Sequence, residues 1–62
     1  MTAEEIKAFR KSPERNWSQA DLAARIGVDQ ATVSRAENGT PLPKAAAMLL
    51  DMLVEESREK AA

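Results

Sequence analysis

The segment from Ser18 to Gly39, SQADLAARIGVDQATVSRAENG, constrains the fold more than any other part of this chain. It contains two helical patterns separated by only three residues, Gly27, Val28 and Asp29. Glycine is favoured just after the last turn of a helix, and aspartate is favoured as an N-cap. So short a connection predicts helices that cross steeply, with the small Ala23 at the crossing. Spacing alone leaves open an ordinary helical hairpin or a binding motif.

Helix-start signals recur along the chain. Thr2 with Glu5, and Ser18 with Asp21, have the spacing of a capping box, in which each side chain bonds the other residue's backbone N–H. No alternating apolar and polar stretch indicates a strand, so we predict an all-α fold. We expect helices over about residues 3–12, 19–26, 30–38 and 43–60, the last opening on Pro43, a residue favoured at the first helical position.

Length and composition limit the class of protein. Sixty-two residues predict a single compact domain over residues 1–62, with four or at most five helices and a thin core. The chain has no cysteine, histidine or tyrosine, so we expect no disulfide, metal site, cofactor or enzymatic activity. No apolar run is long enough to cross a membrane, and we expect no membrane partner.

Charge is distributed unevenly although the formal net charge is only −1. Residues 10–44 carry six basic against four acidic side chains, whereas residues 51–62 carry four acidic against two basic. The middle of the chain is therefore mildly basic and the tail acidic. This distribution allows one side of the protein to face phosphate despite the negative net charge.

The outer face of the helix expected over residues 30–38 lacks carboxylates. At about 100° per residue, Val33, Ala36 and Glu37 fall on one side. The other side carries Gln30, Ala31, Ser34, Arg35 and Asn38. Glutamine can pair with adenine, arginine with guanine, and an alanine methyl can contact thymine, while acids would meet phosphate repulsion. The face therefore favours the binding motif over a plain hairpin.

The stretch WSQADLAARIGVDQATVSRAENG resembles the helix-turn-helix of the phage repressor/Cro (XRE) family of bacterial and phage DNA-binding regulators. Together with the flanking helices, the similarity covers about residues 3–54. It implies that the second motif helix enters the major groove of double-stranded DNA, and that Gln19 touches phosphate and braces Gln30. The implied base contacts are Gln30, Ala31, Ser34 and Arg35. The expected phosphate contacts are Arg15, Asn16, Ser18, Gln19, Thr32, Asn38, Thr40 and Lys44.

The resemblance also implies an ion pair inside the domain. Glu37 lies on the inward side of its helix, where an unpaired carboxylate is costly. Similar family members place an arginine of the first helix against that glutamate, and Arg10 is the matching position, so we expect a structural ion pair.

The segment KSPERNW is about two residues longer than is typical, which is why Arg15 and Asn16 join the phosphate candidates. Trp17 is either part of the core or a stacking platform for bases, and its place before the Ser18 cap favours the core.

The last helix carries more apolar surface than one buried face needs. Ala46, Leu49, Leu50 and Leu53 form a stripe that we expect to pack on the other helices. Ala45, Met48 and Met52 form a second stripe, which favours a homodimer with two recognition helices about 34 Å apart. The alternative is a monomer in which both stripes thicken the core.

These patterns predict a sequence-specific DNA-binding transcriptional regulator, most simply a small dimeric repressor. We expect it in the cytoplasm of a bacterial or phage-infected cell, associated with the nucleoid. Two alternatives stay open: an antitoxin that binds a toxin or other protein partner and regulates its own synthesis, and a helical interaction module that has lost DNA binding.

Overall fold

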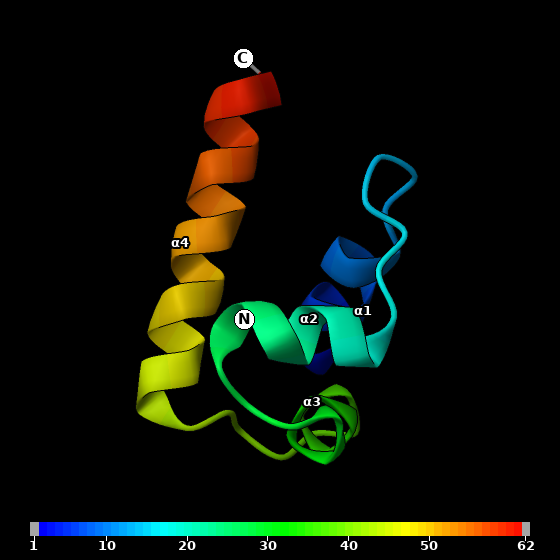
Figure 1. Ribbon diagram of the computed structural model, residues 1–62, viewed down its shortest axis with the longest axis vertical. Helices are drawn as coiled ribbons and strands as arrows, with labels where there is room; N and C mark the ends of the chain where they lie inside the picture. Colours follow the sequence, from blue (N-terminus) through cyan, green and yellow to red (C-terminus); the bar gives the residue numbers. More distant parts are fainter. Residues whose placement is uncertain (1, 62) are drawn as a thin grey trace.

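The computed structural model describes residues 2–61, and side chains over residues 2–59. This part of the chain forms four helices and no strand: α1 (Ala3–Lys11), α2 (Gln19–Ile26), α3 (Gln30–Glu37) and α4 (Lys44–Ala61). The all-α prediction is confirmed, and every expected helix end lies within one residue of the observed one. Figure 1 shows α2 between α3 and the α1–α2 connection, with α4 along one edge of the molecule.

The predicted start and stop signals account for these boundaries. Both capping boxes are formed: Thr2 and Glu5 exchange bonds of 2.9 and 3.1 Å, and Ser18 and Asp21 exchange bonds of 2.9 and 3.0 Å. Gly27 ends α2 in the left-handed conformation, with φ of 75°, which glycine adopts without steric cost. The tight reversal between α2 and α3 therefore depends on that residue.

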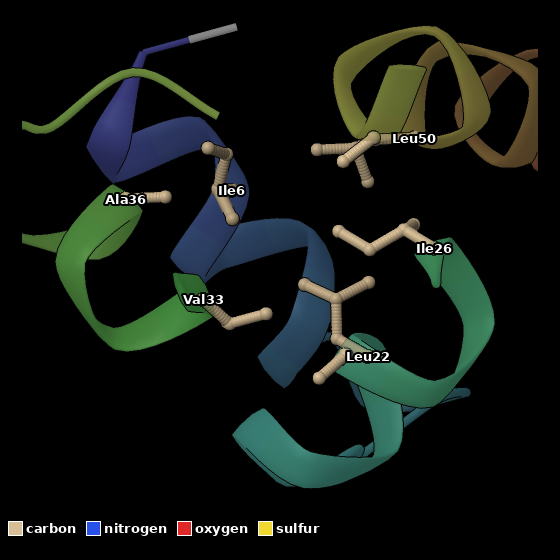
Figure 2. Close-up of a cluster of buried hydrophobic side chains, with 8 residues drawn as sticks. Ile6, Leu22, Ile26, Val33, Ala36 and Leu50 are labelled. Atoms are coloured by element: carbon tan, nitrogen blue, oxygen red, sulfur yellow. The ribbon is translucent and has the colours of Figure 1, made fainter. Parts of the chain in front are cut away.

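The core lies where α1, α2, α3 and α4 meet. Its buried side chains are Ile6, Leu22, Ala23, Ile26, Val33, Ala36, Ala46 and Leu50. Figure 2 shows Leu22 and Ile26 of α2 between Val33 of α3 and Leu50 of α4. The inward faces predicted for α2 and α3 are confirmed by this burial. Because α2 lies in the centre, the shared core side chains fix the orientation of α3 relative to α2.

The prediction for α4 is wrong at one position. Leu49 is 41% exposed rather than packed on the other helices. The core-facing residues are Ala46 and Leu50, with Leu53 and Val54 partly buried beside them. Leu49 lies about 100° around the helix from Leu50, at the edge of the side of α4 that packs on α2 and the core.

Trp17 packs into the molecule from the α1–α2 connection. Its ring meets that of Phe9 edge-on at 6.0 Å, and the guanidinium carbon of Arg25 lies 4.1 Å from its ring centre. Asn16, just before it, has a φ of 49°, a left-handed conformation that asparagine tolerates. Trp17 is therefore a half-buried part of the core, and Arg25 covers its face.

Candidate nucleic-acid interface

The outer face of α3 is open to solvent. Gln30, Ala31 and Arg35 are exposed and Ser34 is half-buried, while Val33 on the opposite side is 1% exposed. α3 has no acidic residue in its first turn. The structure thus presents the expected base-contacting residues along one helix and leaves them accessible.

Gln30 is held by a neighbour on α2. Its Nε2 donates a hydrogen bond to Oε1 of Gln19 at 2.6 Å. Nε2 of Gln19 in turn donates to Oε1 of Glu37 at 3.3 Å. Gln19 is therefore fixed at both ends of its amide, and it fixes the orientation of Gln30 at the surface.

Glu37 forms a buried, two-point ion pair with Arg10 of α1. Nε of Arg10 donates to Oε2 of Glu37 at 2.6 Å, and Nη2 donates to Oε1 at 2.8 Å. Nη1 of Arg10 donates to the Trp17 carbonyl oxygen at 3.1 Å. The two residues are only 8% and 7% exposed. The structure thus brings together the pair expected from the sequence, and the pair joins α1 to α3.

These bonds form one hydrogen-bond chain, which runs from Gln30 through Gln19, Glu37 and Arg10 to the Trp17 carbonyl. It connects the surface of α3 to the interior of the domain. Hydrogen bonds from Arg10 hold the pKa of the Glu37 carboxyl below its ordinary value. The same contact raises the pKa of Arg10. Both groups are charged at neutral pH.

A second polar group lies at the start of α3. Oδ1 of Asp29 accepts hydrogen bonds from the Thr32 backbone N–H at 2.9 Å and the Thr32 hydroxyl at 2.5 Å. These bonds lower the pKa of Asp29. Nη2 of Arg35 donates to the same hydroxyl oxygen at 3.2 Å, so Arg35 lies along the helix toward its N-terminus. The link between Thr32 and Arg35 has no signal in the sequence beyond their spacing of three residues.

The residues expected to contact phosphate differ in exposure and in their hydrogen bonds. Asn16, Ser18, Asn38, Thr40 and Lys44 are exposed, whereas Gln19 and Thr32 are half-buried. Nδ2 of Asn38 donates to the Ser34 carbonyl oxygen at 2.8 Å, which ties it to the end of α3. The hydroxyl of Ser18 accepts from the Asp21 backbone N–H at 3.0 Å as the cap of α2.

Arg15, for which a phosphate contact was expected, makes several contacts within the domain. Its Nη1 donates to the Phe9 carbonyl oxygen at 2.9 Å and also bonds the Ser12 hydroxyl. Its Nη2 bonds the Ser57 hydroxyl of α4, and its guanidinium carbon lies 3.8 Å from the Phe9 ring centre. The turn of the α1–α2 connection directs this side chain toward α4, a direction that sequence spacing could not reveal.

The lowered pKa of Glu37 predicts a specific pH dependence of stability. A carboxyl whose pKa is lower in the folded state stabilises it above the unfolded pKa of about 4.3, and this contribution is lost as the pH falls through the lowered value. We expect wild type to exceed Glu37→Gln in free energy of unfolding by a constant amount between neutral pH and about pH 5, and the difference to shrink below about pH 4.

Urea unfolding of both proteins over a pH series, followed by circular dichroism, measures this difference. The other carboxyls are present in both proteins, so their titration cancels in the comparison. A difference that persists unchanged at strongly acidic pH would contradict the assignment.

The fold and this surface define a DNA-binding helix-turn-helix domain, with α2 and α3 as the motif and α3 as its polar outer helix. A family model described as Helix-turn-helix matches residues 6–50, more than half of the chain. The chain belongs to the XRE-type helix-turn-helix family, and it is a DNA-binding regulator of that type. Comparison with curated proteins and with solved structures found no match.

No helix within residues 2–61 is both long and apolar enough to span a membrane. Among the described residues, no group of three or more cysteine, histidine or acidic side chains is arranged to hold a metal ion.

Proposed function

We propose that this protein is a small repressor that recognises a specific operator as a homodimer, with α3 of each chain in the major groove. The observation that carries the proposal is the exposed, acid-free face of α3, on which Gln30 is already fixed by Gln19. A side chain fixed before binding loses less entropy when it meets a base edge.

Each exposed residue of α3 has chemistry suited to a base edge. The amide of Gln30 can donate and accept, which matches adenine N7 and N6. The methyl of Ala31 suits a thymine methyl, and the hydroxyl of Ser34 can bond several bases. The guanidinium of Arg35 suits the O6 and N7 of guanine, and leaving Thr32 for that contact breaks only one exposed hydrogen bond.

Phosphate contacts position the helix on either side of the groove. The N-terminus of α2 presents backbone N–H groups beside Ser18 and Gln19, and such helix ends attract anions. Asn38 and Thr40 are exposed where α3 ends and supply donors on the other side. Asn16, Thr32 and Lys44 are the outer candidates, and occupation of the operator would exclude polymerase.

Selection of random double-stranded DNA with the purified protein tests this function directly. Enrichment of two half-sites related by dyad symmetry is expected, because a twofold dimer binds a palindromic site. Failure to enrich any sequence would contradict specific recognition. Co-purification of the native chain with a small second protein would instead favour the antitoxin alternative, for which the exposed apolar face of α4 offers a surface.

Binding is expected to weaken as salt concentration rises, because each neutralised phosphate releases counterions. The logarithm of the binding constant should fall linearly with the logarithm of salt concentration, by about 0.9 for each phosphate neutralised. Fluorescence anisotropy with labelled DNA over a salt series measures the slope. An affinity that does not change with salt would favour a module that has lost DNA binding.

A further inference from the structure

The most exposed apolar surface of the domain is one face of α4. Within the part of the chain that the structure describes, the exposed large hydrophobic side chains are Met48 (58%), Leu49 (41%) and Met52 (66%). Ala45, also exposed, lies on the same face. These four residues, the α4 stripe, follow the spacing i, i+3, i+4 and i+7 of a helix that packs against a partner.

Met48 and Met52 of the α4 stripe point away from the buried side of the helix, and Leu49 lies at its edge. At about 100° per residue, Met48 lies about 160–200° around the helix from Ala46 and Leu50, which are 2% and 1% exposed in the core. A partner can therefore dock on the stripe without displacing the core. The stripe also lies on a helix distinct from the α3 face, so both surfaces can be occupied at once.

We infer that the α4 stripe binds the α4 stripe of a second copy of this chain, with the two helices antiparallel and the twofold axis between Met48 and Leu49. The inference rests on the proposed homodimer and names the surface and register that form it. An isologous contact of this kind requires that the patch be complementary to itself.

Side-chain sizes fit this register. In this register, Met48 of one chain faces Leu49 of the other, and Ala45 faces Met52. The two residue numbers of every facing pair therefore sum to 97. Each alanine thus meets a methionine, and two pairs of methionine with leucine fill the centre. Alternating small and large residues across an interface allows the two surfaces to interdigitate.

Charges on one flank of the stripe select the antiparallel arrangement. Lys44, Asp51 and Glu55 lie on the same side of the stripe, at about 100° per residue. In the antiparallel pair this flank meets the same flank of the second copy. Lys44 then lies level with residue 53 of the other chain, between Asp51 and Glu55. In a parallel pair this flank would instead meet the opposite flank of the second copy, where Ala46 and Leu53 lie and Lys44 has no acidic partner.

This pairing gives Lys44 a role other than the phosphate contact expected from its sequence position. The two roles separate in a measurement without DNA. Exchanging the charges of the flank tests the register, because each altered chain should repel its own copy and attract the other. The two variants are Lys44→Glu, which makes positions 44, 51 and 55 all acidic, and Asp51→Lys with Glu55→Lys, which makes the same three positions all basic.

Sedimentation equilibrium of wild type and variants without DNA measures the association. Each variant alone is expected to dimerise about tenfold more weakly than wild type, and an equimolar mixture to associate at least as well as wild type. Lys11→Glu, a charge reversal at an exposed position of α1, is the matched control and should dimerise like wild type. Circular dichroism checks that every variant is folded.

Three outcomes would overturn the inference. A wild-type chain that remains monomeric at high micromolar concentration excludes a second copy as the occupant. Charge variants that dimerise like wild type, while Met48→Glu is monomeric, exclude the antiparallel register. Met48→Glu that still dimerises excludes the surface. Sequence selection by the wild-type chain is scored independently, so each of these results can occur while specific DNA recognition stands.

Discussion

Replacing Glu37 with alanine is expected to destabilise the domain by about 3–5 kcal/mol, because it leaves the Arg10 guanidinium buried without a counter-charge. The loss is large relative to the whole. A chain of 62 residues has a free energy of unfolding of about 3–9 kcal/mol at typical values per residue. We therefore expect a substantial fraction of the variant to be unfolded at room temperature.

Urea titration followed by circular dichroism and by the fluorescence of Trp17 measures this loss. Glu59→Ala, which removes an exposed carboxylate from α4, is the control and should change the free energy of unfolding by less than about 0.5 kcal/mol. Replacing both Arg10 and Glu37 with methionine should recover much of the stability, since no buried charge then remains. A Glu37→Ala variant as stable as the control would show that the ion pair does not hold α1 to α3.

Replacing Arg35 with alanine is expected to remove most of the preference for the selected operator. A two-point contact between arginine and guanine is worth about 1–3 kcal/mol of discrimination, or about 5–150-fold in affinity for each half-site. Binding to unrelated DNA should change much less, since it depends on phosphate contacts. Stability should be nearly unaffected, because the Arg35 side chain is exposed and, among the described residues, donates one hydrogen bond, to Thr32.

Anisotropy titrations with operator and scrambled duplexes separate the two effects. Arg25→Ala is the matched control, because it also removes an exposed arginine, but one that lies over Trp17 rather than on the outer face of α3. That variant should retain the preference for the operator. Equal loss of preference in both variants, or in neither, would contradict the assignment of α3 to the groove.

Local signals in the sequence predicted the helices well because each signal acts within a few residues. The caps at Thr2, Ser18 and Asp29 and the left-handed Gly27 satisfy backbone groups of their own helices, so their spacing alone fixes the ends. The inward face of α3 was predictable for the same reason, since helical periodicity determines which side chains share a side.

Contacts between distant residues were less accessible from the sequence. Arg10 and Glu37 are 27 positions apart and give no local signal, and the pair was expected only through resemblance to a family. Leu49 was assigned to the core because periodicity shows the direction of a side chain but not how wide a strip its neighbours cover. The contacts of Arg15 with Phe9 and Ser57 could not be predicted, because the path of the α1–α2 connection includes a left-handed Asn16 that spacing does not reveal.

The hydrogen-bond chain from Gln30 to the Trp17 carbonyl divides the outer face of α3 into two kinds of position. Ala31 and Arg35 are not part of this series of hydrogen bonds. Natural or engineered substitutions at these two positions can therefore change the target site with little loss of stability. Gln30 is different, because a new residue there leaves Gln19 short of a partner and disturbs Glu37 behind it. Retargeting of this domain should therefore proceed by substitutions at residues 31 and 35 while residue 30 changes last.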